Sequence, residues 1–159
     1  GKAVEHWDNI QTKLPPNPSG HDMLDGETTI TDIDKTEVNR ELVRMFTTQV
    51  LVKRQFDRLE NYIDDRLIQH DPEVADGIAA LRSKLQTAAN GTPRISYKHL
   101  HRVLAEGNFV LCMSEGRKAG IHSGIYDLFR VADGMIVECW NTISPMAPRS
   151  EWKNDNGKF

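Results

Sequence analysis

From Ile125 to Ile143 the chain reads IYDLFRVADGMIVECWNTI, the most informative segment of the sequence. Branched and aromatic residues crowd both halves, and Asp133-Gly134 between them supplies the positive backbone dihedrals that a tight turn between antiparallel strands requires. The pattern predicts a β-hairpin. Asp127 stands in its first arm, where a carboxylate is poorly suited to a strand and costly to bury without a partner. We therefore expect Asp127 either on the wet face of a sheet or in a pocket.

Alternation along the two arms sorts their side chains between two faces. If Asp127 faces inward, so does Phe129, because every second residue of a strand points to the same side. On the second arm, one of the two alternating sets of residues must face the pocket. We choose the set that places small or neutral polar groups beside Phe129 and leaves the charged Glu138 outside. The inward residues of that arm are then Val137, Cys139 and Asn141.

Helical patterns come before the strands. The three predicted helices are marked by Val38, Leu42, Phe46 and Val50 behind Asp34, by Phe56, Leu59 and Ile63, and by Ile78, Leu81 and Leu85 before Asn90-Gly91. Period-two patterns take over at residues 95–103 and 109–115, ahead of the hairpin. Helices followed by a meander of strands predict an α+β domain, with three helices packed on the concave face of a curved antiparallel sheet.

Length and composition fit one globular domain. The 159 residues suffice for a buried core, and 20 basic residues scattered among 23 acidic ones argue against a nucleic-acid footprint. The longest apolar runs, 50–52 and 109–113, are far shorter than a bilayer span, so we expect no membrane partner. The two cysteines stand in apolar segments, which indicates free thiols in a reducing compartment and favours a cytoplasmic protein.

Residues 1–35 differ from the rest, because clustered prolines and glycines break any regular element there. Residues 1–10 nevertheless share five positions with residues 134–143. We interpret this segment as an extension that carries an orphan strand from the end of a preceding repeat, ahead of a domain at 36–159. A chance match over ten residues is the alternative.

The candidate base is His70, which precedes a proline turn at the end of a predicted short helix. There an imidazole could close the mouth of a cavity between the helices and the sheet. Because its ordinary pKa lies near 6.5, a neutral imidazole can accept a proton at physiological pH. The alternative is that His70 only caps a turn or bonds Asp71.

Signatures of metals and cofactors are weak. His99 and His101 share one strand face, but nothing in the sequence nominates further ligands, so we predict no metal site. The sequence contains no Gly-rich phosphate loop, no Gly-x-Ser-x-Gly elbow and no Cys-x-x-Cys pair. We predict a protein that works without a cofactor.

Several pieces of the chain, taken in order and spacing, resemble the SnoaL-like branch of the nuclear transport factor 2 superfamily. They are residues 62–72, Asp76-Gly77, the YDLFRV run at 126–131, Asp133-Gly134 and residues 136–140. The resemblance covers residues 36–159. It implies a cone-shaped α+β barrel in which a curved sheet wraps around helices and leaves one apolar cavity, commonly in a homodimer.

The resemblance also implies a chemistry. Characterised SnoaL-like relatives include polyketide cyclases that close a ring by intramolecular aldol condensation without metal or cofactor, and their acid/base aspartate lies on the strand that here carries Asp127. Related ketosteroid isomerases place a carboxylate base near the position of His70 and a protonated aspartic acid near that of Asp127. The isomerase phenol falls on Phe46, which cannot donate a hydrogen bond, so a steroid isomerase is disfavoured. The family usually reads Glu-His-Trp-Asp where residues 138–141 read Glu-Cys-Trp-Asn, while residues 5–8 keep the usual version.

Our leading hypothesis is proton transfer on a small apolar or aromatic carbonyl compound that can enolise, in an isomerase or aldol-type cyclase. His70 would remove the proton, and Asp127, kept neutral by burial, would stabilise or protonate the oxyanion. The predicted pocket is lined by Phe46, Tyr62, Phe129, Cys139 and Asn141. A non-catalytic ligand-binding or dimerisation module should instead show this pocket closed or filled. An epoxide or ester hydrolase should show Asp127 bonded to a second polar group that positions water.

Overall fold

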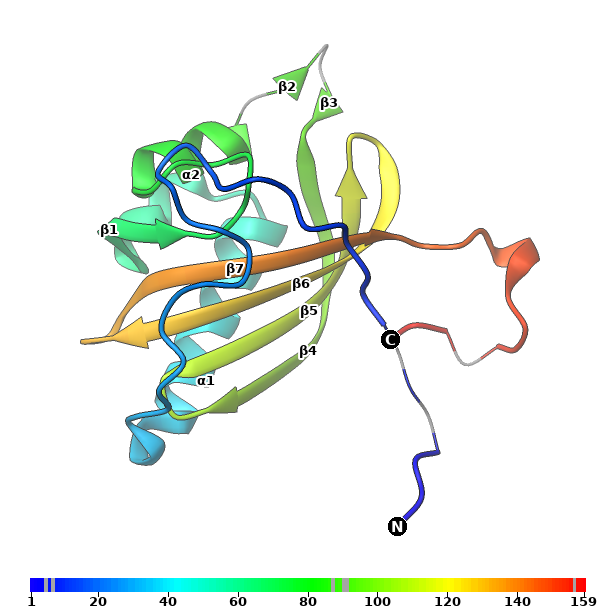
Figure 1. Cartoon of the computed structure of the whole chain (residues 1–159), viewed down its shortest axis with the longest axis horizontal. Helices are drawn as coiled ribbons and strands as arrows, with labels where there is room; N and C mark the ends of the chain where they lie inside the picture. The colour runs from blue at the N-terminus through cyan, green and yellow to red at the C-terminus, as the bar shows by residue number, and fades with distance from the viewer. Residues whose placement is uncertain (5, 7, 87, 90–91, 156) are drawn as a thin grey trace.

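The computed structural model describes residues 1–4, 6, 8–86, 88–89, 92–155 and 157–159. At its centre is a curved sheet in the order β1-β7-β6-β5-β4 (Figure 1). Four strands form an antiparallel meander: β4 (Ile95–Glu106), β5 (Phe109–Lys118), β6 (Ile121–Ala132) and β7 (Met135–Pro145). Beyond the start of β4 lies a pair of two-residue strands, β2 (Ala88–Ala89) and β3 (Thr92–Pro93). The predicted α+β class is confirmed.

The hairpin of β6 and β7 turns at Asp133-Gly134 as predicted, with φ of 51° and 75° at the two turn residues. Asp127 pairs with Asn141 and Phe129 with Cys139, so these four side chains share one face. The predicted place of Val137 in this set is wrong. The register shifts between Arg130 and Val131, and Ile136 takes the place opposite Val131 and is fully buried.

The predicted second helix, marked by Phe56, Leu59 and Ile63, is wrong at its C-terminal end, because Ile63 belongs to a strand. A 3-10 turn, η3 (Phe56–Asn61), leads into a strand, β1 (Ile63–Gln69), which lies parallel to β7 at the edge of the sheet. The sheet is therefore mixed rather than wholly antiparallel. Ile63 and Leu67 are buried on its inner side, whereas the short apolar pattern around them fits a helix equally well.

The first helix, α1 (Thr36–Phe46), follows a 3-10 turn, η1 (Ile33–Lys35), and continues directly into a π-helical segment, η2 (Thr47–Val52). The buried residues of α1 are Asn39, Val43 and Phe46, and those of η2 are Thr47, Val50 and Leu51. Val38, which we expect on the buried face of α1, is 69% exposed, because the helix repeats every 3.6 residues rather than every four.

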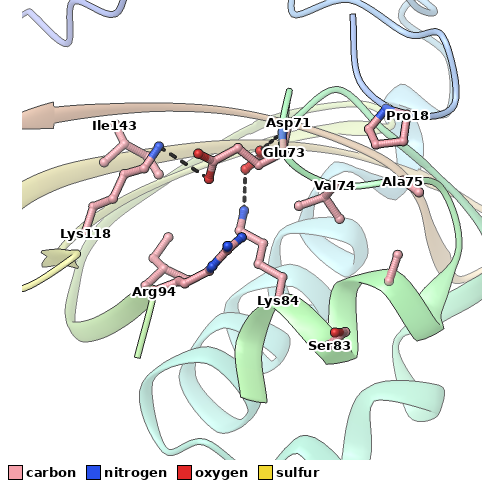
Figure 2. A pocket seen from close by; sticks show the side chains of 12 residues that line it. Pro18, Asp71, Glu73, Val74, Ala75, Ser83, Lys84, Arg94, Lys118 and Ile143 are labelled. Atoms are coloured by element: carbon pink, nitrogen blue, oxygen red, sulfur yellow. Dashed lines mark hydrogen bonds and ion pairs between the residues drawn. The ribbon is translucent and has the colours of Figure 1, made fainter. Parts of the chain in front are cut away.

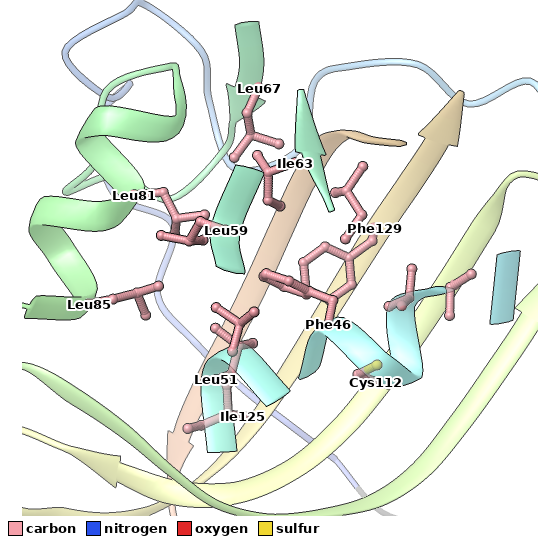
Figure 3. Packing of buried hydrophobic residues seen from close by; sticks show 14 of the residues in the cluster. Phe46, Leu51, Leu59, Ile63, Leu67, Leu81, Leu85, Cys112, Ile125 and Phe129 are labelled. Carbon is pink, nitrogen blue, oxygen red and sulfur yellow. The ribbon is translucent and has the colours of Figure 1, made fainter. Parts of the chain in front are cut away.

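The predicted third helix is α2 (Ile78–Gln86), and its Leu81 and Leu85 are buried. Its expected stop at Asn90-Gly91 lies outside the described residues. Both helices pack on the concave face of the sheet, and Figure 3 shows Phe46, Leu81 and Phe129 among the side chains that meet there. In the described part of the chain, no helix is long and apolar enough to cross a membrane.

In the N-terminal segment, residues 8–32 form irregular chain that runs across β7 (Figure 1). The described residues of the segment form no strand before η1, and Glu5 and Trp7 of the repeat lie outside the description. The segment is bound by side chains: Asn9 donates to the carbonyl of Thr142 at 2.6 Å, and Trp140 donates to the carbonyl of Asp25 at 2.8 Å. An origin in a preceding repeat stays a prediction.

Candidate active site

Asp127 lies on β6 at the centre of the concave face and is 4% exposed. The phenol of Tyr97, on β4, donates a hydrogen bond to Asp127 Oδ1 over 3.2 Å. Asp127 Oδ2 has no hydrogen-bond partner among the described residues. The inward orientation predicted for Asp127 is confirmed, and its carboxyl keeps one oxygen available.

Burial raises the pKa of Asp127 to about 7, because an ionised carboxylate is disfavoured away from water. The charge of Lys84 and the bond from Tyr97 act in the opposite direction and only partly offset this effect. Burial and the neighbouring Asp127 also hold the pKa of Tyr97 well above its usual value. At neutral pH the phenol is therefore a hydrogen-bond donor, while Asp127 is populated as both acid and carboxylate.

A small cavity of about 30 Å³ lies beside Asp127, between the two helices and the sheet. This volume matches a single water molecule. Gln69, at the end of β1, lines the same cavity, and its Nε2 has no partner among the described residues. Its Oε1 accepts a hydrogen bond from the thiol of Cys139 over 3.1 Å, and burial raises the pKa of that thiol. In the described part of the chain, Asp127, whose Oδ2 lacks a partner, and Gln69, whose Nε2 lacks one, thus line the same cavity.

A larger pocket of about 460 Å³, which we call the vestibule, opens to the outside between α2, the loop after β1 and the start of β4 (Figure 2). Lys84 lines both the vestibule and the cavity beside Asp127, so its side chain lies at their boundary. It forms an ion pair with the buried Asp71, which also accepts a hydrogen bond from Asn141 over 2.8 Å. Burial alone would raise the pKa of Asp71, but Lys84 and the hydrogen bonds outweigh it and lower the pKa to about 2.

Four of the five predicted pocket residues line the cavity: Phe46, Phe129, Cys139 and Asn141. Tyr62 does not. Its ring packs on that of Phe46 with centroids 5.9 Å apart, and its hydroxyl donates to Gln49 Oε1 over 3.0 Å.

His70 is not brought together with Asp127, so the prediction that both face one cavity is wrong. Because successive side chains of a strand point to opposite faces, Gln69 enters the cavity and His70 lies on the other side of the sheet. There its ring stacks on Trp140 at 4.5 Å, and its Nε2 lies 2.8 Å from Oε1 of Glu138. Its Nδ1 lies 2.8 Å from the carbonyl oxygen of Asp22, in the N-terminal segment.

Glu138 is on the outer face as predicted, but it is buried beneath the N-terminal segment rather than exposed. Its second oxygen accepts a hydrogen bond from Nε of Arg130 over 2.6 Å. A glycine in the segment, Gly26, makes this close packing possible. A Cβ atom there would lie 2.5 Å from Oε1 of Glu138 and 2.9 Å from Nε2 of His70.

Sequence reasoning missed Gln69, Tyr97, Lys84 and Asp71 as site residues. Simple alternation puts Tyr97 on one face with His99, but the register shifts between these two residues. The partner of Asp127 depends on the pairing of β4 through β5 to β6. Gln69 becomes an inner residue only because residues 63–69 form a strand.

Among the described residues, no group of three or more His, Cys, Asp or Glu side chains is arranged to hold a metal ion. The rings of His99 and His101 contact each other, with centroids 4.5 Å apart. His101 Nε2 lies 3.3 Å from Glu115. These contacts give the two histidines protein partners on the sheet surface.

Comparison with known proteins places this arrangement in context. The model of the SnoaL-like domain family matches residues 42–139, more than half of the chain. Among solved structures, a proposed ketosteroid isomerase from Kribbella flavida DSM 17836 is 15% identical with a TM-score of 0.61, over 78% of this chain and 94% of that one. A proposed SnoaL-like polyketide cyclase from Jannaschia sp. CCS1 is 18% identical with a TM-score of 0.53, over 74% and 91%.

An LEH-like epoxide hydrolase from M. tuberculosis is 20% identical with a TM-score of 0.52, over 69% of this chain and 85% of that one. A search among curated proteins found no match. At these identities the solved structures show a shared fold.

Proposed function

The chain belongs to the SnoaL-like domain family, and from this membership we propose that it catalyses proton transfer on a small molecule, with Asp127 as the acid–base group. Its α+β cone is shared with solved structures of the nuclear transport factor 2-like fold. Ketosteroid isomerisation, polyketide cyclisation and epoxide hydrolysis, the reactions for which three structural relatives are named, each require a proton to be moved. A buried carboxyl with a pKa of about 7 suits that task at neutral pH.

The observation that carries this proposal is that Asp127 and Gln69 line one cavity and that Asp127 Oδ2 and Gln69 Nε2 each lack a partner among the described residues. Both atoms are buried. Burying an unpartnered polar group is costly, so such a group in a native protein calls for an explanation, and a catalytic role is one. An enolising carbonyl compound needs a base for its α-proton and a hydrogen-bond donor for its oxygen. The acceptor and the donor here meet these two needs.

We propose the following step for an enolisable carbonyl substrate. Asp127 Oδ2, as carboxylate, takes a proton from the carbon next to the carbonyl, and the electron pair of that C–H bond moves into an enolate. Gln69 Nε2 donates a hydrogen bond to the enolate oxygen, while Tyr97 holds the carboxyl through Oδ1. The protonated Asp127 then returns the proton to a different carbon in an isomerase. In a cyclase the enolate attacks a second carbonyl of the same molecule, and the proton goes to the new alkoxide.

Access to Asp127 requires movement, because a cavity of about 30 Å³ is too small for such a substrate. The vestibule has a suitable size, and Lys84 stands between the two spaces. We propose that the substrate enters through the vestibule and that the contacts of Lys84 and Asn141 with Asp71 open as it binds.

Exchange of α-hydrogens for deuterium tests the proposal without knowledge of the natural product. Small ketones and 1,3-dicarbonyl compounds are incubated with the protein in D₂O, and the loss of the α-proton signal is followed by NMR. We expect accelerated exchange for some of these compounds and a fall of about 10² to 10⁴ for Asp127→Asn, the usual contribution of one acid–base group. Exchange that is equal in both proteins would contradict the proposal.

A hydrolase is the second candidate, and one observation favours it. Asp127 is bonded to a second polar group, Tyr97, and the cavity beside it has the volume of one water molecule. A water held between Asp127 Oδ2 and Gln69 Nε2 could be activated for attack on an epoxide. Incorporation of ¹⁸O from labelled water into a diol, with no α-exchange of ketones, would favour this reaction.

A binding module without turnover is supported by the closed state of the cavity. Ligand binding with neither α-exchange nor hydration would favour it. The homodimer implied by the family resemblance also stays a proposal. It is tested by the native mass of the protein, compared with 18.0 kDa for one chain.

A further inference from the structure

The vestibule carries more positive than negative charge. Its lining includes three cations, Lys84, Arg94 and Lys118, and two carboxylates, Asp71 and Glu73 (Figure 2). Lys84 is paired with Asp71, and Lys118 Nζ lies 3.9 Å from Glu73 Oε2. Each carboxylate of the vestibule therefore has its own cation, and Arg94 forms an ion pair with neither of them.

Arg94 is held in place by its backbone rather than by its guanidinium. Its carbonyl oxygen accepts a hydrogen bond from the amide of Ala119 over 2.9 Å, in the turn between β5 and β6. Arg94 is exposed, and its guanidinium makes no hydrogen bond or ion pair with a described residue. A guanidinium presents a fixed fork of donors that matches a carboxylate, so an uncommitted arginine at a pocket suits the binding of an anion.

We propose that Arg94 binds a carboxylate of the substrate, so that the natural substrate is an acidic carbonyl compound such as a keto acid. This inference rests on the proposed function for the reacting end of the molecule. The rest of the substrate would lie against the apolar side chains of the vestibule, among them Val74, Ala80, Ile95 and Ile143.

The position of Arg94 beside β4 also limits the length of the substrate. Arg94 is the residue before β4 and precedes Tyr97 by three residues, and an extended chain spans about 3.3 Å per residue, so their backbones are roughly 10 Å apart at most. Tyr97 holds Asp127, and the reacting carbon must lie beside that carboxyl. The substrate therefore places several bonds between its carboxylate and its reacting carbonyl.

The test compares 7-oxooctanoate with its methyl ester, which differ in charge but share the ketone and the chain. Dissociation constants are measured by NMR titration of the ¹⁵N-labelled full chain. We expect the wild-type protein to bind the acid on the order of 10-fold more tightly than the ester, as a charge-assisted hydrogen bond provides. Arg94→Gln should remove this preference and leave ester binding unchanged.

Arg66→Gln is the matched control, because it removes the same charge from a side chain that is 91% exposed and outside the vestibule. It should keep the preference for the acid. Equal binding of acid and ester by the wild type, no binding of the acid, or an equal loss in both arginine variants would overturn the inference.

Asp127→Asn separates this inference from the proposed function. That variant should retain the preference for the acid while losing α-exchange. A preference for the acid without any α-exchange would overturn the catalytic role alone. If α-exchange depends on Asp127 but is the same for the acid and its methyl ester, only the role of Arg94 would be overturned.

Discussion

The phenol of Tyr97 donates to Oδ1 of Asp127 over 3.2 Å, while Oδ2 of this cavity-lining residue has no partner among the described residues. The bond stabilises the carboxylate and thereby limits the rise in pKa that burial causes. It also fixes the plane of the carboxyl, so the free oxygen has a defined direction. The two strands involved, β4 and β6, are not neighbours, since β5 lies between them.

Replacement of Tyr97 by Phe should shift the pH dependence of α-exchange. If Asp127 acts as base, it must be ionised, so kcat/KM in the wild type should rise with pH to a plateau above about 7. Loss of the hydrogen bond raises the pKa of Asp127, so the rise should move to higher pH in Tyr97→Phe. A pH profile that is unchanged, or shifted to lower pH, would contradict the assigned role of Tyr97.

Replacement of Lys84 by Met should destabilise the fold, because it leaves the carboxylate of Asp71 buried without its cation. Breaking a buried pair costs on the order of 3 kcal/mol, measurable by urea unfolding at pH 7. Lys98→Met is the control, since Lys98 is 76% exposed in its pair with Glu115 and should lose less than about 1 kcal/mol.

The effect of Lys84→Met should also depend on pH. The folded pKa of Asp71, about 2, lies below the ordinary 3.8, so the pair contributes stability above pH 4 that is lost as the pH falls toward 2. The two proteins should therefore become more alike in acid. A difference that is constant from pH 7 to pH 3 would show that the ion pair is not its cause.

Replacement of His70 by Gln should lower stability while preserving catalysis. The ring is 2% exposed and stacks on Trp140 on the face of the sheet opposite the cavity. We expect a loss on the order of 1 to 3 kcal/mol in unfolding experiments, because buried hydrogen bonds are broken. The rate of α-exchange should stay within about 3-fold of wild type, well short of the usual contribution of an acid–base group. A loss of exchange as large as that of Asp127→Asn would restore His70 as a catalytic residue.

Replacement of Gly26 by Ala should detach the N-terminal segment. The new Cβ would lie 2.5 Å from Glu138 Oε1 and 2.6 Å from Trp140 Cζ2, closer than real contacts. Limited proteolysis should then cleave residues 1–26 faster. Gly20→Ala is the matched control, because Gly20 also has positive φ, 92° against 113°, but nothing lies within 4 Å of its Cβ position. Equal cleavage of the two variants would argue against the close packing at Gly26.

The hairpin and the class of fold could be predicted because their signals are local. Asp133-Gly134 determines the turn, and alternation along β6 places Asp127 and Phe129 on one face whatever the rest of the chain does. The SnoaL-like resemblance follows from the same stretches. The conformation of residues 63–69 was harder to predict, because a seven-residue apolar pattern with acidic residues fits a helix as well as an edge strand.

The single misassignment of β1 explains most of the error in the site. A helix around Ile63 leaves the direction of His70 open, whereas a strand sends Gln69 and His70 to opposite faces. The burial of Glu138 beneath the N-terminal segment could not be predicted either. It depends on contacts of Asp25 and Gly26 with the sheet, and these residues belong to no helix or strand. Long-range partners of this kind have no periodic signal in a sequence.

The most direct test of the central claim is a ¹³C NMR titration of the aspartate carboxyl carbons, in the wild-type protein and in Asp127→Asn. Our account predicts one carboxyl that titrates near pH 7 in the wild type and is missing from the spectrum of the variant. If every aspartate titrates below pH 5, Asp127 is an ordinary ionised carboxylate, and its role as the acid–base group is contradicted.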